Sequence, residues 1–309
     1  MKDDSQNGTD RRSFLKKAIG IGGALLASRI APAMASGRGI GWADQVGVQL
    51  YTLRDRMEKN FEGTIEKVAE IGYDEVEFAG YFDRSPEDVR ALLDRLDLTS
   101  PSTHVGLEAF REDLDGTLDS AATIGHTYVT IPSLPGAYGG QFQEEDWRGF
   151  AEEFNRIGAA AGERGLKLAY HNHDFEFRPA GDATTGYDVL VTETDPDLVA
   201  FELDLFWAVL AGQDPIELFE RYPGRFALWH VKDLKNIEAT RAAAAGGREG
   251  RRTVMQNMTA VGEGEINFAD IFDRAERSGL EHYFVENDAP DDSVKNVETS
   301  FANLMALLS

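Results

Sequence analysis

Short apolar runs recur along the chain, and polar side chains follow each of them. From residue 46 onward there are eight such runs, rich in Val, Leu, Ile, Phe and Tyr. Their near-continuous hydrophobicity is typical of parallel strands that helices cover on the outside. The pattern therefore predicts eight strands, over residues 46–51, 74–78, 98–104, 127–131, 166–170, 199–204, 226–233 and 283–286.

Segments with apolar residues at helical spacing separate the predicted strands. Ser85 and Pro86 are typical of a helix start, and Gly72 and Gly125 of helix ends. Helices are expected over residues 61–71, 86–96, 109–124, 144–164, 187–192, 215–222, 268–278 and 294–308. Strand–helix repeats without a long break in composition predict the α/β class and a single (β/α)8 TIM barrel over residues 46–309.

A doubly wound open sheet is the alternative arrangement of such repeats. It would need a Gly-rich phosphate loop after the first strand, but residues 52–55 read TLRD. The long connection 234–266 is expected to be a loop. Its Ala-, Gly- and Arg-rich piece, residues 242–252, is expected to be mobile.

The first 45 residues carry an export pattern instead of a fold pattern. Arg11 and Arg12 precede an apolar Gly/Ala-rich run over 18–27, and Ala33-Met34-Ala35 has the small residues of a cleavage site. We expect a twin-arginine signal peptide over 1–35, a linker over 36–45, and a periplasmic or extracellular mature protein. The apolar run is shorter than the ~20 residues of a spanning helix, so no stable membrane insertion is expected after cleavage.

Composition excludes several classes of function. The 309 residues carry a formal net charge of −23, which disfavours binding to nucleic acid. There is no cysteine, so neither disulfides nor thiolate metal sites can form. A homo-oligomer is compatible with the sequence.

Polar residues end the predicted strands, and the carboxyl ends of barrel strands are where such folds hold their active sites. Burying ionisable groups without partners is costly, so their convergence indicates a site. His126 and His282 precede strands and are expected to be structural. The strand-end set is Gln49, Tyr51, Arg54, Glu77, His104, His171, Asn172, His173, Asp204, His230, Lys232, Asp233 and Glu286.

Asp204, His230 and Glu286 end three successive strands. They offer oxygen and nitrogen donors without sulfur, which suits a divalent ion of Mn, Zn, Co or Mg.

Eight short motifs, in order, carry a family resemblance. They read VGVQLYTLRD, GYDEVEFAG, STHVG, GLKLAYHNHDFEF, FELDLFW, LWHVKD, VGEGEINF and YFVEND. With them the chain resembles the sugar phosphate isomerase/epimerase superfamily of xylose isomerase-like TIM barrels, here as an exported twin-arginine member. The resemblance implies a divalent ion held by a Glu, an Asp, a His and a Glu on strands five to eight. The last three match Asp204, His230 and Glu286.

The fifth strand departs from that pattern. The usual Glu-Asn-His reads His171-Asn172-His173, so His171 stands where a ligand carboxylate is expected. His171 can still bind a metal through an imidazole nitrogen, and Glu176 is the other candidate for the fourth ligand.

The resemblance also implies proton transfer through an enediolate. Glu286 would be one catalytic base, with Glu176 or His173 as the second. Lys232 would polarise an oxygen, although an ion pair with Asp233 or Asp204 explains it equally well. The residues expected to bind substrate are Gln49, Tyr51, Arg54, Glu77, His104, Asn172 and Trp207.

We expect a metal-dependent isomerase or epimerase. Its expected partner is a small-molecule carbohydrate, either a free sugar or a keto-sugar. Export and the few basic residues at the site disfavour a sugar phosphate. One alternative is a 3-keto-glycoside lyase or hydrolase on the same barrel, and another is a non-catalytic carbohydrate-binding protein. A related apurinic-site endonuclease would need a basic DNA groove, which this acidic chain does not predict.

Overall fold

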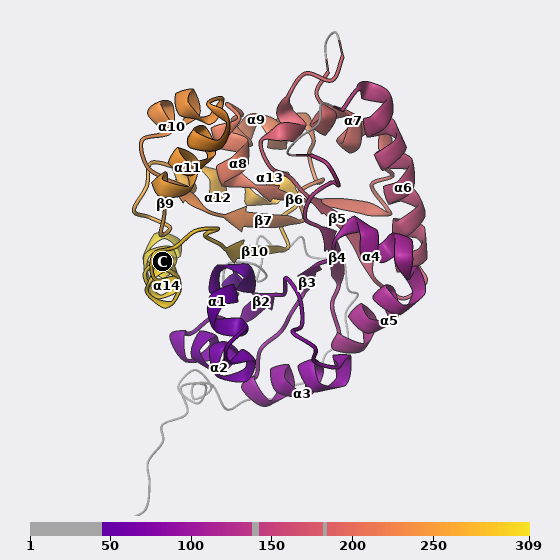
Figure 1. The fold of residues 1–309 in the computed structure, drawn as a ribbon, viewed down its shortest axis with the longest axis vertical. Helices are drawn as coiled ribbons and strands as arrows, with labels where there is room; N and C mark the ends of the chain where they lie inside the picture. The colour runs from indigo at the N-terminus through magenta and orange to yellow at the C-terminus, as the bar shows by residue number, and fades with distance from the viewer. Residues whose placement is uncertain (1–44, 138–141, 182–183) are drawn as a thin grey trace, which may run out of the picture. The chain divides into compact units, whose positions relative to one another are not determined.

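Eight parallel strands form the barrel that the sequence predicts (Figure 1). They are β1 (Gly47–Gln49), β2 (Glu75–Glu77), β3 (Ser102–His104), β4 (Tyr128–Ile131), β5 (Lys167–His171), β6 (Val199–Asp204), β7 (Leu228–Val231) and β10 (His282–Val285). The strand order is β2-β1-β10-β7-β6-β5-β4-β3, and parallel bridges Glu75–Thr99 and Phe78–Thr103 nearly close the ring. The predicted TIM barrel is therefore confirmed.

The computed structural model describes residues 45–137, 142–181 and 184–309, which belong to one compact unit. The expected signal peptide over 1–35 lies outside the described residues, and so does the expected linker over 36–45 except for its last residue. Within the described part of the chain, no helix is long and apolar enough to cross a membrane.

Helices surround the strands (Figure 1). The main helices are α2 (Phe61–Ile71), α3 (Pro86–Leu96), α4 (Leu107–Glu112), α5 (Leu114–Ile124), α6 (Glu144–Gly162), α7 (Gly186–Glu193), α9 (Pro215–Arg221), α12 (Phe268–Phe272), α13 (Ala275–Ser278) and α14 (Ser293–Leu308). Short turns follow several strands: η2 (Leu50–Leu53) and α1 (Arg54–Met57) after β1, η3 (Phe175–Phe177) after β5, and α8 (Leu205–Leu210) after β6.

Two predicted helices are each divided. The helix expected over 109–124 is interrupted at Asp113, whose side chain instead accepts a hydrogen bond from the Gly116 N–H and caps α5. The helix expected over 268–278 is interrupted at Arg274, between α12 and α13. Apolar spacing continues across both breaks, so hydrophobic periodicity could not reveal them.

The connection 234–266 was wrongly expected to be a loop. It contains α10 (Ile237–Ala244), α11 (Gly247–Asn257) and the antiparallel pair β8 (Asp233–Leu234) with β9 (Met258–Thr259). The high helix propensity of Ala and Arg explains the two helices. The Asp233 carboxylate accepts hydrogen bonds from the N–H groups of Gly262, Gly264 and Ile266, and so holds the end of the connection.

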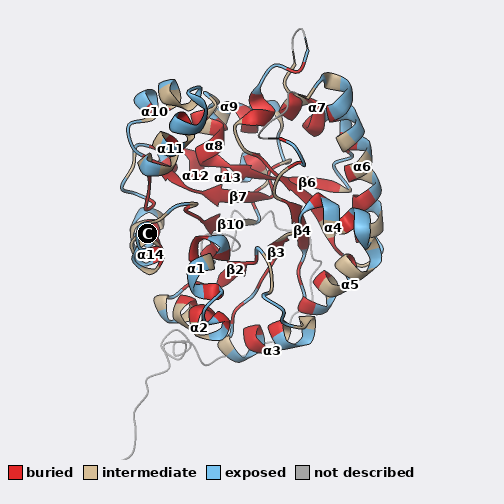
Figure 2. Cartoon of the chain, in the orientation of Figure 1, coloured by how far each residue is buried: buried red, intermediate tan, exposed pale blue. Residues whose placement is uncertain are grey.

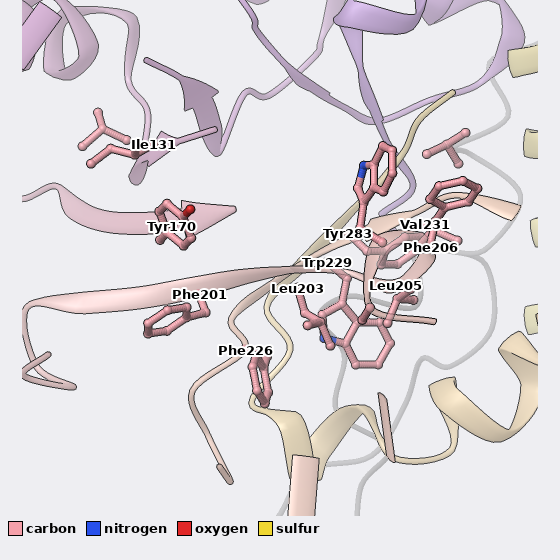
Figure 3. Packing of buried hydrophobic residues seen from close by; sticks show 14 of the residues in the cluster. Ile131, Tyr170, Phe201, Leu203, Leu205, Phe206, Phe226, Trp229, Val231 and Tyr283 are labelled. Carbon is pink, nitrogen blue, oxygen red and sulfur yellow. The ribbon is translucent and has the colours of Figure 1, made fainter. Parts of the chain in front are cut away.

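The barrel strands are mostly buried (Figure 2), and their alternating side chains face two different environments. Outward residues such as Phe201, Leu203 and Trp229 belong to the main core between strands and helices (Figure 3). Inward residues form a separate small apolar cluster, which includes Ala169 and Phe284. Because side chains alternate with period two, the inward residues one step further along the strands are polar and reach the carboxyl end.

Both histidines expected to be structural lie at the amino ends of strands. His282 Nδ1 lies 2.9 Å from a Glu75 oxygen. His126 is buried, with Nδ1 2.7 Å from the Ser100 carbonyl oxygen and Nε2 3.0 Å from the Tyr81 hydroxyl. Burial lowers the pKa of His126 to about 4, with a smaller contribution from Arg90.

His126 should make the folded state less stable in acid. In the unfolded chain His126 is protonated below its ordinary pKa of 6.5, whereas in the folded chain it is protonated only below about pH 4. We expect stability to fall by about 1.4 kcal/mol per pH unit across this window. His126→Gln should lose this contribution, so its stability difference from wild type should shrink between about pH 7.5 and pH 5 in urea unfolding. An unchanged difference would contradict the prediction.

Candidate active site and cation-binding cluster

A cavity of about 460 Å³ opens at the carboxyl ends of the strands. It brings together residues from several barrel strands or their following loops and from α11. Its lining residues are Tyr51, Ala79, His104, Gly106, Pro132, Ser133, His171, His173, Lys232, Arg251, Met255, Glu286 and Asp288. Six of these were expected from the strand-end pattern: Tyr51, His104, His171, His173, Lys232 and Glu286.

Lys232 is the cationic centre of the site. Its Nζ lies 2.6 Å from Glu286 Oε2 and 2.9 Å from both Asp204 Oδ2 and Asp288 Oδ1. Burial lowers the pKa of Lys232, but the three carboxylates raise it by more, to well above its usual value. The expected ion pair with Asp204 is present, whereas Asp233 binds backbone N–H groups instead.

His230 is buried among three carboxylates. Nδ1 lies 2.7 Å from Glu286 Oε2, and Nε2 lies 2.6 Å from Glu77 Oε2 and 3.1 Å from Glu202 Oε2. Burial opposes the charged ring, yet these carboxylates raise the pKa of His230 well above its usual value. Burial likewise opposes ionisation of Glu286, but Lys232 and His230 hold its pKa well below the usual range.

Glu202 lies beneath this layer and was missed by the sequence reasoning. Its Oε2 lies 2.7 Å from His104 Nε2, 3.0 Å from His171 Nδ1 and 3.1 Å from His230 Nε2. Burial raises the pKa of Glu202, but the His230 and His104 rings lower it by more, so that the pKa is well below its usual range. The signal was available, because Glu202 and Asp204 are two residues apart on one strand and face the same side.

The fifth-strand stretch contributes two imidazoles to the cavity. Burial and the charge of His230 lower the pKa of His171 to about 3. Burial lowers the pKa of His173 well below its usual value, and the neighbouring His171 lowers it as well. Asn172 does not line the cavity; its side chain accepts from the Asp204 N–H and donates to the Asp204 carbonyl, which couples β5 to β6.

The structure does not bring Glu176 to the cavity. Its carboxyl group accepts hydrogen bonds from the Tyr170 hydroxyl and the His173 N–H, at 2.7 and 2.9 Å. Burial raises the pKa of Glu176 to about 8. These contacts make it a support of the β5 turn, instead of the second base or fourth ligand that the sequence suggested.

The other expected substrate residues divide into two groups. Tyr51 lines the cavity and is 42% exposed, and Arg54 stacks on its ring while donating to the Asp288 carbonyl. Gln49 and Glu77 are buried and hydrogen-bonded to each other at 2.7 Å. Trp207 is also buried, between His173 and Arg251, so it supports the wall without lining the cavity.

Two groups of side chains within the described residues have donor atoms close enough to hold a metal ion. One is Asp204, His230 and Glu286; the other is His104, His171, Glu202 and His230. The Oε1 atom of Glu202 is buried and has no hydrogen-bond partner among the described residues. Oxygen and nitrogen donors with an unsatisfied carboxylate oxygen fit a divalent cation. The first group is the predicted trio; the second was not expected as a set.

The sequence analysis also did not name Asp288 and Arg251 as site residues. Asp288 follows the last residue expected for the eighth strand, and its carboxylate binds Lys232. Arg251 belongs to α11, in the connection that was expected to be mobile, and it lies over the Trp207 ring with Cζ 5.0 Å from the centroid. Residues placed by an unpredicted helix could not be assigned to the site from strand ends.

Comparison with known proteins places the chain among similar barrels. Residues 65–308 match the model of the family described as xylose isomerase-like TIM barrel. An inosose dehydratase of Clostridium perfringens is 27% identical over 261 residues, covering 77% of this chain and 86% of that one. A sugar phosphate isomerase/epimerase from Parabacteroides distasonis has a TM-score of 0.70 at 27% identity, covering 90% of this chain and 100% of that one.

A xylose isomerase-like TIM barrel protein from Mycobacterium smegmatis, in complex with magnesium, shares the fold. Its TM-score is 0.60 at 16% identity, and the match covers 87% of this chain and 99% of that one.

Lys232 should be needed to hold its carboxylates in the folded state. In metal-free protein with a chelator, Lys232→Met leaves buried carboxylates without their cation and should cost about 3–5 kcal/mol in urea unfolding. Lys235→Met is the matched control, since the Lys235 side chain is about half-exposed and its Nζ lies 3.8 Å from Glu263 Oε2. The control should cost at most about 1 kcal/mol. Equal losses in the two variants would contradict this account.

Proposed function

Because the chain belongs to the xylose isomerase-like TIM barrel family, we propose that it is a lyase acting on a keto-sugar or a related cyclic keto-polyol. It removes the proton next to the carbonyl and expels a hydroxyl or glycosidic group from the neighbouring carbon. The relatives named inosose dehydratase support this class of reaction.

The observation that carries the proposal is the unequal chemistry of the two sides of the cavity. Glu286 and Asp288 supply carboxylates beside Lys232, whereas β5 supplies the imidazoles of His171 and His173. Both imidazole pKa values are lowered, so these rings are uncharged at neutral pH and hold no imidazolium proton to return to carbon. Epimerisation needs an effective acid–base group on each face of the substrate, whereas elimination can use one side.

Glu286 and Lys232 then have complementary roles. The ionised Glu286 accepts the proton as the C–H bond breaks and the carbon–carbon double bond forms. The carbon–oxygen bond to the leaving group breaks in turn, and the leaving oxygen takes a proton from the Lys232 ammonium. The 2.6 Å contact between Lys232 and Glu286 lets the proton pass back and restores both groups.

Asp204, His230 and Glu286 would hold the divalent cation in this proposal. His171 is the fourth candidate, because its Nε2 lies 3.6 Å from Asp204 Oδ2. Once bound, such an ion polarises a carbonyl and acidifies the neighbouring C–H. Tyr51 and His104, at the edge of the cavity, would orient substrate hydroxyls, and Arg251 adds a cation to that wall.

An isomerase or epimerase is the second candidate. The match to the Parabacteroides protein of that name favours it, as does the sequence resemblance. Both reactions begin with proton removal, and they differ in whether the proton is returned to carbon or a group is expelled.

We also propose that the protein works outside the cytoplasm, which the Arg11-Arg12 pattern supports. A reporter protein fused behind residues 1–45 should be exported, and a reporter that stays in the cytoplasm would oppose this proposal.

The reaction can be tested with a panel of inososes, ketoses and 3-keto-glycosides in deuterated water. For the metal-loaded protein we expect an unsaturated product or its tautomer, together with released water or alcohol. Isomeric products that carry solvent deuterium without a released group would instead establish the second candidate. If no member of the panel exchanges or reacts, the enzymatic proposal fails.

Glu286→Gln should lower kcat by about 10²- to 10⁴-fold, because a positioned base contributes that much. Glu176→Gln is the matched control, since its amide can still accept from the His173 N–H and donate to the Tyr170 oxygen. The control should keep activity within a few-fold. A large loss in Glu176→Gln, with little loss in Glu286→Gln, would reverse their assigned roles.

A further inference from the structure

Four donor atoms from four different strands meet around Glu202, next to the cavity that His104 and His171 line. His104 Nε2 comes from β3, His171 Nδ1 from β5, Glu202 Oε2 from β6 and His230 Nε2 from β7. The three ring nitrogens lie 2.7, 3.0 and 3.1 Å from the single oxygen Glu202 Oε2. On β6 this group is one inward position deeper than Asp204.

Hydrogen bonding alone accounts poorly for this arrangement. Glu202 Oε2 is hydrogen-bonded to His104 Nε2 and His171 Nδ1, whereas His230 Nε2 is hydrogen-bonded to Glu77 Oε2 at 2.6 Å. The other oxygen, Glu202 Oε1, is meanwhile buried without a hydrogen-bond partner among the described residues. In a tetrahedral site with ligand bonds of about 2.0–2.2 Å, neighbouring donors lie about 3.3–3.6 Å apart. The three separations from Glu202 Oε2, 2.7, 3.0 and 3.1 Å, would need to increase by roughly 0.2–0.9 Å.

The local negative charge also exceeds the positive charge of the protein groups beside it. Five carboxylates, those of Glu77, Glu202, Asp204, Glu286 and Asp288, lie in or directly beneath the site, and Lys232 and the His230 ring supply positive charge next to them. The remaining negative charge is buried, where uncompensated carboxylates are costly. A single divalent ion at Asp204, His230 and Glu286 would leave part of it unbalanced.

His171 and His230 each present one ring nitrogen to either group. Nδ1 of His171 faces Glu202, and its Nε2 lies 3.6 Å from Asp204 Oδ2. Nε2 of His230 faces Glu202, and its Nδ1 faces Glu286. The two donor groups are therefore adjacent but use different atoms.

We propose that His104, His171, His230 and Glu202 form a second cation site beneath the Asp204–His230–Glu286 group. Its three nitrogen donors and one oxygen select Zn²⁺ or Co²⁺ over Mg²⁺, which prefers oxygen. This proposal concerns binding alone and does not depend on the reaction proposed above.

Wild-type protein tests the site without any substitution. Chelator-stripped protein titrated with Co²⁺ should bind two equivalents, one of them giving the strong visible absorption of four-coordinate nitrogen-rich cobalt. Anomalous diffraction from zinc-soaked crystals should place one ion among His104, His171, His230 and Glu202. Binding of a single equivalent, or an anomalous peak only at Asp204 and Glu286, would overturn the proposal.

His104→Gln removes a donor that belongs only to the deeper group. The variant should bind one equivalent of Co²⁺ and lose the four-coordinate absorption, with affinity at the deeper site reduced by more than about 100-fold, since even an outer-shell partner is worth 10- to 100-fold. His282→Gln is the matched control, because His282 also contacts a carboxylate but at the opposite end of the barrel. Two equivalents retained in His104→Gln, or a loss equally large in the control, would contradict the site.

Discussion

The site depends on the burial of several carboxylates inside the carboxyl end of the barrel. Glu77 ends β2 and Glu202 and Asp204 lie at the end of β6, and Glu286 and Asp288 follow the last strand. Such a concentration of negative charge is unfavourable in a poorly solvated interior unless cations accompany it. The contacts of Lys232 and His230 therefore hold the site together, and in the proposed reaction they are also the source of its reactivity.

That constraint explains why the ionisation states differ within a few ångströms. Glu286 stays ionised because Lys232 and His230 outweigh its burial, while burial keeps the pKa of Asp204 raised, to about 6, against the same two cations. Within the described part of the chain Glu176 lacks such cations, and burial raises its pKa to about 8 although its hydrogen bonds oppose the shift. Glu286 contacts both Lys232 and His230, whereas Glu176 is hydrogen-bonded to Tyr170 and the His173 N–H and supports a turn.

The fold was largely predictable because its signals are local. Apolar runs located all eight barrel strands, and caps such as Ser85 and Gly125 marked helix ends. The failures also have local causes. Asp113 ends one helix and caps the next without disturbing the apolar spacing, and the Ala- and Arg-rich connection forms helices although it lacks an apolar stripe wide enough to be recognised. The site prediction relied on strand ends and therefore omitted Glu202, which lies inside a strand, and Arg251, which lies on such a helix.

The substitution on β5 fits the same electrostatic constraint. A carboxylate at position 171 would add another negative charge next to Glu202 and Asp204, which lie 3.0 and 3.6 Å from the His171 ring nitrogens. An imidazole keeps a donor at that position without adding charge, but it gives up an acid–base group on that side of the cavity. His171 thus avoids a further negative charge among these carboxylates, and in the proposed function the same residue favours one-sided elimination over two-sided proton exchange.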